Sequence, residues 1–233
     1  MTKIPYLTIG IGVATAGMLL GYTIVWVLWV DIEAYRFATL AHHNYLRARH
    51  GSAPLSLNLD LCNLAMMCAR YYANSKRVDH SCPYHPQGKT FYFTEGIGEN
   101  LWGPANTFSH YDAAVGATRR FYQEIDTYNF SDVKSNFHKF FVVGHITQIL
   151  WRQTRQVGIG VASDSKRVYV VAFYYPSGNL WEENMEAVEQ NVGPPLKDVP
   201  PIHIYGRWGW RFENDTREAL AAENKYLLTP FPP

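Results

Sequence analysis

The side chain in this sequence best suited to do chemistry is the histidine in the run GHITQILWRQT, residues 144–154. His145 precedes Ile146, Ile149 and Leu150, which can face a hydrophobic core, and this spacing predicts a short helix that begins at His145. Packing of these neighbours would hold the imidazole in one place, where it can ligate a metal ion or transfer a proton. For a single histidine the alternative is a hydrogen-bonded core residue without a chemical role.

Three further side chains can join His145 in one cleft. His80 precedes a Ser-Cys-Pro loop, Glu99 lies in Gly-Glu-Asn, and Glu124 is expected on a long helix at the margin of the core. Two imidazoles and two carboxylates would suit zinc or another divalent cation, with His80 and His145 as the metal ligands. They would equally suit acid–base chemistry, or a hydrogen-bond network that only holds the cleft together. The four residues lie far apart in the sequence, so spacing alone does not bring them together.

The elements that must position these groups are helices followed by a late hairpin. Apolar periodicity predicts helices over residues 32–49, from about residue 58 or 60, over 109–128 and at His145. The second of these helices carries a continuous apolar stripe, made of Leu61, Leu64, Ala65, Cys68, Ala69 and Tyr72. Residues 99–102 read as a short strand, and 156–163 and 166–175 as two strands joined by a turn. This order predicts an α+β fold, with helices layered on an antiparallel sheet.

Composition indicates a packed domain and gives no sign of nucleic-acid binding. Hydrophobic residues make up 47% of the 233 residues and charged residues 18%, which favours a sizeable core over disorder. The formal net charge is +1, so there is no electrostatic argument for a nucleic-acid partner.

The chain has three cysteines, Cys62, Cys68 and Cys82. On one helix Cys62 and Cys68 would point to different faces, whereas Cys82 could pair with either. A small, odd number argues against a disulfide-built scaffold, and without a CxxC motif a cysteine zinc site is not expected. We therefore predict that all three cysteines are reduced.

Residues 1–31 are predicted to form a single transmembrane anchor. Residues 7–30 carry no charge over 24 positions, and a helix of that length spans about 36 Å, enough to cross a bilayer with some tilt. A cleaved signal peptide is the competing interpretation, but the end of the run lacks a small-residue cleavage site. Lys3 before the span favours a domain on the far side of the membrane, whereas the low cysteine count favours the cytosolic side. The sequons at Asn129 and Asn214 matter only in the first case.

Residues 194–233 form a C-terminal extension of different character. It begins with a proline-rich linker and continues with a glycine-flanked aromatic run. Trp208, Trp210 and Phe212 are the candidate contacts with a protein partner, because aromatic anchors concentrate at interfaces. The alternative is that they fold back onto their own domain.

Several short motifs occur in the order found in one known family. They are His43-Asn44 with Arg47, His50-Gly51 with Pro54-Leu55, His80, Gly98-Glu99-Asn100-Leu101, Phe121-Tyr122 with Glu124-Ile125 and Tyr128-Asn129-Phe130, Gly144-His145 with Thr147-Gln148 and Trp151, and Tyr174 with Pro176 and Gly178-Asn179. This pattern resembles the CAP superfamily of cysteine-rich secretory, antigen 5 and pathogenesis-related 1 proteins. The few cysteines are similar to those of its Golgi-associated pathogenesis-related branch. The resemblance covers roughly residues 34–195 and assigns residues 32–193 to a CAP domain.

The resemblance implies a three-layer α-β-α sandwich with a surface cleft. The cleft residues of the family match His80, Glu99, Glu124 and His145. Members bind zinc or other divalent ions there, several bind sterols, fatty acids or anionic phospholipids, and a general enzymatic activity is not established for the family. One departure is Ala172, which stands where secreted members have a cysteine.

Three functions are therefore in competition. The first is a single-pass, membrane-anchored, non-enzymatic protein of an endomembrane, as in the Golgi, or of the cell surface, which binds a lipid or sterol and can hold a divalent metal. The second is an accessory subunit of a membrane protein complex, held through residues 7–30 and 194–233. The third is a hydrolase with Ser81 or a metal-bound water as nucleophile, although no nucleophile elbow and no HExxH motif is present.

Overall fold

The computed structural model describes residues 32, 34–86, 94–106, 109–182 and 184–197. Met1–Ala34 and Tyr35–Pro233 form two separate compact units, and nearly all described residues belong to the second. None of the helices in the described part of the chain is long and apolar enough to cross a bilayer. The predicted anchor at residues 7–30 lies outside that part, as do Trp208, Trp210 and Phe212.

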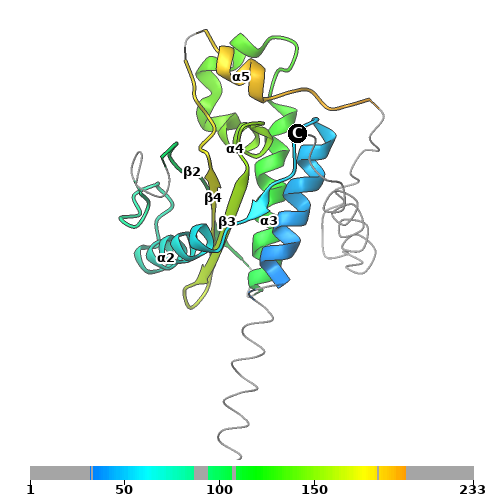
Figure 1. The fold of residues 1–233 in the computed structure, drawn as a ribbon. Coiled ribbons are helices and arrows are strands. Elements are labelled where there is room, and N and C mark those ends of the chain that lie inside the picture. The colour runs from blue at the N-terminus through cyan, green and yellow to red at the C-terminus, as the bar shows by residue number, and fades with distance from the viewer. Residues whose placement is uncertain (1–31, 33, 87–93, 107–108, 183, 198–233) are drawn as a thin grey trace, which may run out of the picture. The chain divides into compact units, whose positions relative to one another are not determined.

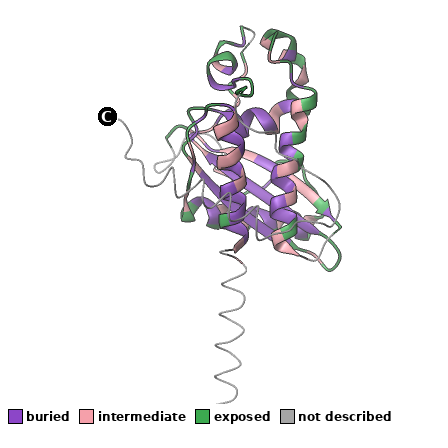
Figure 2. Cartoon of the chain, turned by 90° about the vertical axis from the view of Figure 1, so that its right-hand side faces the viewer, coloured by how far each residue is buried: buried purple, intermediate pink, exposed green. Residues whose placement is uncertain are grey.

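The centre of the domain is a mixed four-stranded sheet in the order β1-β3-β4-β2 (Figure 1). The strands are β1 Ser56–Leu57, β2 Gly98–Ala105, β3 Gln156–Ser163 and β4 Val168–Tyr175. β3 and β4 form an antiparallel hairpin, β2 pairs antiparallel with β4, and the short β1 pairs parallel with β3. β3 has the bounds that its sequence predicts, and almost every residue of β3 and β4 is buried or half-buried (Figure 2).

Helices cover both faces of this sheet. α2 (Leu59–Ser75) packs against β3 and β4 on one face, whereas α3 (His110–Tyr122) and the helix of residues 34–49 lie on the other (Figure 1). α4 (Phe140–Leu150) packs beside α3, and α5 (Glu186–Asn191) follows the sheet. Along β4 the side chains alternate between these layers: Phe173 joins the core with α2, whereas Tyr174 bonds His43 on the opposite face. The layers therefore form the α-β-α arrangement predicted.

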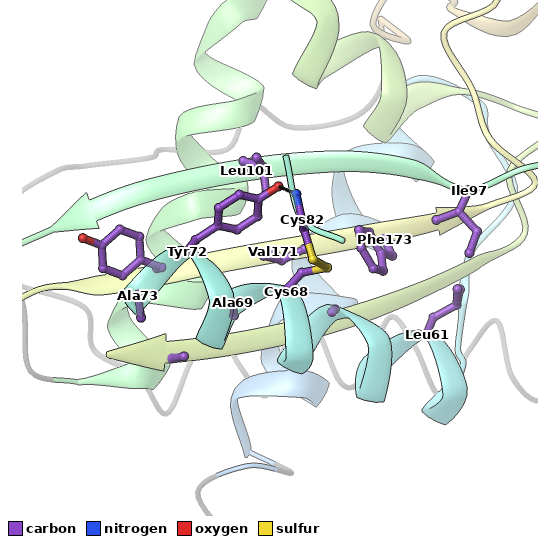
Figure 3. Packing of buried hydrophobic residues seen from close by; sticks show 13 residues of the cluster. Leu61, Cys68, Ala69, Tyr72, Ala73, Cys82, Ile97, Leu101, Val171 and Phe173 are labelled. Atoms are coloured by element: carbon purple, nitrogen blue, oxygen red, sulfur yellow. Dashed lines mark hydrogen bonds between the residues drawn. A yellow bond between two sulfur atoms is a disulfide. The ribbon is translucent and has the colours of Figure 1, made fainter. Parts of the chain in front are cut away.

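The core between α2 and the sheet is built from the apolar stripe predicted by the sequence (Figure 3). Asn58 is the N-cap of α2, because its side-chain oxygen accepts hydrogen bonds from the backbone N–H groups of Asp60 and Leu61. The stripe packs on Val171 and Phe173 of β4, and its fully buried members are Leu61, Ala65, Cys68, Ala69 and Tyr72.

Two glycines of β3 let α2 approach the sheet closely. A Cβ added at Gly160 would lie 2.1 Å from the carbonyl carbon of Ala65, and one added at Gly158 would lie 2.3 Å from that of Leu61. Such separations are well inside van der Waals contact, so any side chain at these positions would push α2 away from the sheet.

The prediction of three reduced cysteines is wrong, because Cys68 and Cys82 form a disulfide (Figure 3). Cys68 lies on the buried stripe of α2, and the chain turns back after Lys76, whose left-handed backbone ends the helix. The hydroxyl of Tyr72 accepts the backbone N–H of Cys82 and fixes the returning loop. Cys62 is buried and free.

α4 begins at Phe140, five residues before the predicted start at His145. Its first turn is exposed: Phe141 is 94% exposed and Val142 52%. The apolar pattern of a buried face therefore starts only later in the helix, which is why periodicity placed the beginning at His145.

Arg47 holds the end of α4 against the first helix. Its guanidinium is fully buried and donates to the backbone carbonyls of Ala53, Ile149, Trp151 and Thr154 at 2.7–3.0 Å. Burial lowers the pKa of Arg47 to about 9. The four carbonyls replace the hydrogen bonds to water that the guanidinium loses on burial. Arg47, which belongs to the CAP-like motifs, therefore has a structural role.

Candidate functional site

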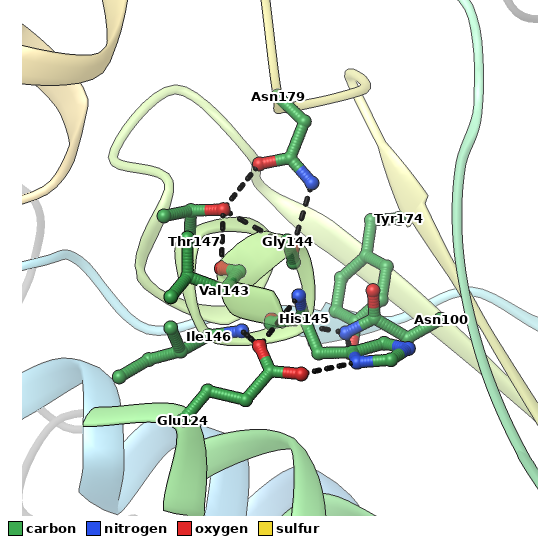
Figure 4. Close-up of polar contacts among 9 residues, drawn as sticks. All are labelled: Asn100, Glu124, Val143, Gly144, His145, Ile146, Thr147, Tyr174 and Asn179. Atoms are coloured by element: carbon green, nitrogen blue, oxygen red, sulfur yellow. Dashed lines mark hydrogen bonds and ion pairs between the residues drawn. The ribbon is translucent and has the colours of Figure 1, made fainter. Parts of the chain in front are cut away.

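Glu124 and His145 form one hydrogen-bonded pair of the predicted site (Figure 4). Glu124 lies in the 3₁₀ turn Gln123–Asp126 that directly follows α3, rather than on the long helix itself. Nδ1–H of His145 donates to Oε1 of Glu124 at 2.6 Å, and Oε2 accepts the backbone N–H groups of His145 and Ile146, both at 3.0 Å. A carboxylate can only accept, so the proton is on Nδ1 and the lone pair of Nε2 is left for a ligand.

Ring stacking and hydrogen bonds fix the position of His145. Its ring stacks on Phe121 of α3, with centroids 4.7 Å apart. Asn100 of β2 donates to the carbonyl of His145 at 3.1 Å, and Asn179, just after β4, donates to that of Gly144 at 2.7 Å. The hydroxyl of Thr147 donates to Oδ1 of Asn179 at 2.7 Å. This part of α4 is therefore held from the sheet, as well as by Glu124.

His80 and Glu99 form the second pair. Nδ1 of His80 lies 2.8 Å from Oε2 of Glu99, and the Tyr72 hydroxyl donates to Oε1 at 3.4 Å. The carboxylate is nearly covered, with 5% of the side chain exposed, whereas the His80 side chain is 58% exposed. The hydrogen bond to Glu99 raises the pKa of His80. The disulfide at Cys82, two residues further on, keeps the His80 loop on α2.

The two pairs contact neighbouring residues of β2. Glu99 and Asn100 are consecutive in this strand, so their side chains point to opposite sides of the sheet. Glu99 contacts Tyr72 of α2, whereas Asn100 contacts α4 beside His145. Each imidazole is therefore bonded to one carboxylate.

The two predicted metal ligands are held in the same way. In each pair the carboxylate binds Nδ1, an arrangement in which acids commonly orient metal-binding imidazoles, and Nε2 is the atom left for an ion. Within the described residues, however, no group of three or more His, Cys, Asp or Glu side chains is arranged to hold a metal ion. Metal binding by His80 and His145 thus stays a prediction.

A pocket opens beside the Glu124–His145 pair. Its volume is about 450 Å³, within the range of small-molecule sites. Trp102, Leu101 and Phe121 line its apolar side, whereas Glu124, His145 and Arg120 provide polar and charged groups. His80 and Glu99 are not among its lining residues.

The histidines of the first helix have structural roles, as the sequence suggested. His43 is fully buried between the carbonyl of Thr39 and the hydroxyl of Tyr174. His50 is buried between the carbonyl of Gly193 and the hydroxyl of Tyr122. Burial lowers the pKa of both imidazoles.

Sequence reasoning gave no role to several residues that build the site. Trp102 lines the pocket, but its position in the alternation along β2 became informative only once the neighbouring elements were placed. Asn100 and Asn179 belong to the recognised motifs, yet their function as supports for α4 follows only from their contacts.

Comparison with known proteins agrees with this fold. The α-β-α layers match the solved structure of NaASP2 with Zn²⁺ at a TM-score of 0.51 and 24% identity, over 65% of this chain and 84% of the other. The model of the CAP family, described as the cysteine-rich secretory protein family, matches residues 40–175. The chain belongs to this family.

Two relatives show the extent of the similarity. Golgi-associated plant pathogenesis-related protein 1 of Homo sapiens is 34% identical over 160 residues, which are 68% of this chain and 92% of the human protein. Pathogenesis-related protein PRMS of Zea mays is 32% identical over 146 residues, 60% of this chain and 76% of the maize protein. The similarity therefore covers the domain and leaves much of the rest of the chain unmatched.

Proposed function

We propose that this chain is a membrane-anchored, non-enzymatic CAP-domain protein that binds a lipid or sterol in the pocket beside Glu124 and His145. The pocket is the observation that carries the proposal. Its apolar side, formed by Trp102, Leu101 and Phe121, suits a hydrocarbon body, and its polar groups suit a hydroxyl or a headgroup. The uncharged segment of residues 7–30 would keep the domain at a membrane surface.

The contacts of the two histidines favour binding over hydrolysis. Nδ1 of His145 is bonded to Glu124, and Nδ1 of His80 is bonded to Glu99. The hydroxyl of Ser81, the nucleophile considered from the sequence, donates to Asp79 instead of to His80. A serine nucleophile needs a base within hydrogen-bond reach, and Ser81 is engaged elsewhere.

A divalent cation such as zinc is part of the proposal as an optional component. Nε2 of His80 and Nε2 of His145 would hold it, with Glu99 and Glu124 orienting the rings. Such an ion would attract an anionic headgroup to the polar end of the pocket. Zinc titration of the wild type and of Glu124→Gln tests this, because loss of an orienting carboxylate should weaken binding about tenfold or more.

The name of a relative supports the proposal that this chain is located at an endomembrane or the cell surface. The human relative is named as Golgi-associated, and its similarity to this chain covers 92% of its length. We extend that location to this chain as part of the proposal.

Ligand binding by the soluble part of the chain tests the central proposal. Tyr35–Pro233 is a separate compact unit, so residues 32–233 can be titrated with a fluorescent sterol and a fluorescent fatty acid. Trp102→Ala should weaken the preferred ligand about tenfold, which corresponds to about 1.4 kcal/mol and is less than the burial of a full aromatic side chain contributes. Tyr84→Ala is the matched control, because Tyr84 is a half-exposed aromatic that lines a different groove with Met67 and Tyr71. Absence of saturable binding to either probe would remove the lipid part of the proposal.

An accessory subunit of a membrane complex is the second candidate, and the exposed first turn of α4 favours it. Phe140, Phe141 and Val142 are all exposed, and the ring of Trp181 lies 5.3 Å from that of Phe140. Exposed adjoining aromatics commonly mark a contact surface. Native gels of membranes that express the full chain test this, because Phe141→Ser should shift it from a large complex to its own size, whereas Trp102→Ala should not.

A further inference from the structure

The disulfide between Cys68 and Cys82 indicates the compartment in which the domain folds. Both cysteines are almost fully buried, at 0% and 2% exposure, within the core between α2 and the sheet. Disulfides of this structural kind form and persist in secretory and extracellular compartments, whereas the cytosol keeps thiols reduced. The low number of cysteines favoured a domain on the cytosolic side, but the disulfide between Cys68 and Cys82 favours the opposite side. The disulfide and the positive charge before residues 7–30 therefore both favour a domain on the non-cytosolic side of the membrane.

A glycosylation sequon lies on the surface of this domain. Residues 129–131 read Asn-Phe-Ser, which fits the acceptor pattern, and both Asn129 and Ser131 are exposed. The sequon occupies the turn between the 3₁₀ helices Gln123–Asp126 and Val133–Lys139. A large polar group at this turn would extend into solvent.

The hydrogen bonds of Asn129 fix its backbone and leave its amide nitrogen accessible. The buried side chain of Asn136 accepts the N–H of Asn129 and donates to its carbonyl, both at 2.9 Å. Oδ1 of Asn129 accepts the N–H groups of Ser131 and Asp132 at 3.0 and 3.1 Å, which turns the amide nitrogen outward. Among the described residues, that nitrogen donates one hydrogen bond, of 3.3 Å, to the exposed hydroxyl of Ser135. Replacement of one of its two hydrogens would leave both Oδ1 bonds in place.

We infer that the domain folds in an oxidising compartment and that Asn129 is an acceptor for an N-linked glycan. In the transfer, Nδ2 of Asn129 bonds to C1 of the sugar of a lipid-linked oligosaccharide. The bond from C1 to the pyrophosphate oxygen of the carrier breaks, and the leaving pyrophosphate takes up the proton that the amide loses. The carrier leaves as the lipid pyrophosphate, and no oxidation or reduction takes place.

The first test is the mass of the full chain made in cultured eukaryotic cells, before and after treatment with a peptide-N-glycosidase. Asn214→Gln removes the other sequon, so any remaining glycan on this background reports on Asn129. Ser131→Ala should abolish that glycan while it keeps the side-chain hydrogen bonds of Asn129, and Ser131→Thr should retain it. The absence of enzyme-sensitive mass on the Asn214→Gln background would overturn the assignment of Asn129.

The second test is alkylation of the same protein after denaturation, with and without prior reduction. Cys62 alone should react before reduction, and all three cysteines should react after it. Reaction of all three without a reductant would overturn the assignment of an oxidising compartment. The two tests have separate readouts, and neither depends on whether the pocket binds a lipid.

Discussion

Acid should destabilise this domain through His43, which couples the first helix to the sheet and to the candidate site. Nδ1–H of His43 donates to the carbonyl of Thr39, and Nε2 accepts the hydroxyl of Tyr174, both at 2.8 Å. The oxygen of Tyr174 in turn accepts from Asn100, whose amide also holds the carbonyl of His145. A second proton on His43 would occupy Nε2, remove the acceptor for the Tyr174 hydroxyl proton and bury a positive charge, so the connection from the first helix to α4 would be weakened.

The size of this effect follows from the pKa of His43. Burial lowers it from the ordinary value of 6.5 to about 4. Between these two values the unfolded chain binds the proton and the folded chain does not, so the free energy of unfolding falls as the pH is lowered through this window. At about 1.4 kcal/mol for each pKa unit, the full loss is about 3 kcal/mol, reached below pH 4. About 2.5 kcal/mol of it should already be lost at a pH of about 4.5.

Urea unfolding of residues 32–233 at a pH of about 7.5 and about 4.5 measures the loss. His43→Gln places a neutral amide at this position, so the variant should lose about 2.5 kcal/mol less than the wild type between the two conditions. The lowered pKa of His50 acts in the same direction as that of His43. The raised pKa of His80 acts oppositely: its pair with Glu99 stabilises the fold at low pH, and this contribution is lost as the pH rises through the folded value. The contributions of His50 and His80 are the same in the wild type and in His43→Gln, so they cancel in the difference between the two proteins. Equal losses in the two proteins would show that His43 does not cause the acid destabilisation.

Three further substitutions test the packing and the site. Glu124→Gln should cost about 2 kcal/mol, because a neutral amide replaces the charged acceptor of His145; an unchanged urea midpoint would argue against the bonded pair. Gly160→Ala should cost at least about 2 kcal/mol, since its Cβ would meet the backbone of α2. Thermal unfolding measures this loss, and wild-type stability in this variant would exclude the close approach of α2. Cys68→Ser should cost about 3 kcal/mol, as expected for a closed loop of roughly 15 residues, and a reductant should destabilise the wild type but not this variant. Equal sensitivity of both proteins to the reductant would show that Cys82 is not bonded to Cys68.

Local patterns predicted the parts of the fold that have one buried face or a clear turn. The stripe from Leu61 to Tyr72 identified α2, because a buried helix face repeats every three or four residues. The two β-branched runs on either side of Asp164 identified the hairpin, and β3 was predicted with its observed bounds. β1 escaped notice, because a strand of two residues has no detectable period.

What the sequence could not predict depends on contacts between distant segments. The bond between Cys68 and Cys82 requires the chain to turn back at Lys76, and cysteine number alone does not reveal that turn. The division of the site into two pairs depends on Glu99 facing α2, which strand alternation indicates only when the neighbouring helices are known. Residue types identified the four polar groups of the site, but their partners had to come from the structure.

The position of a bound lipid shows whether the pocket beside Glu124 and His145 is a lipid site. The full chain in membranes can be labelled with photoreactive sterol and fatty-acid probes, and the modified residues can be located by peptide mass spectrometry. We expect adducts on the walls of the pocket, at Leu101, Trp102 or Phe121, that disappear with an excess of the unlabelled ligand. Adducts confined to the groove beside Tyr84, or to the exposed turn at Phe141, would contradict a lipid site in this pocket.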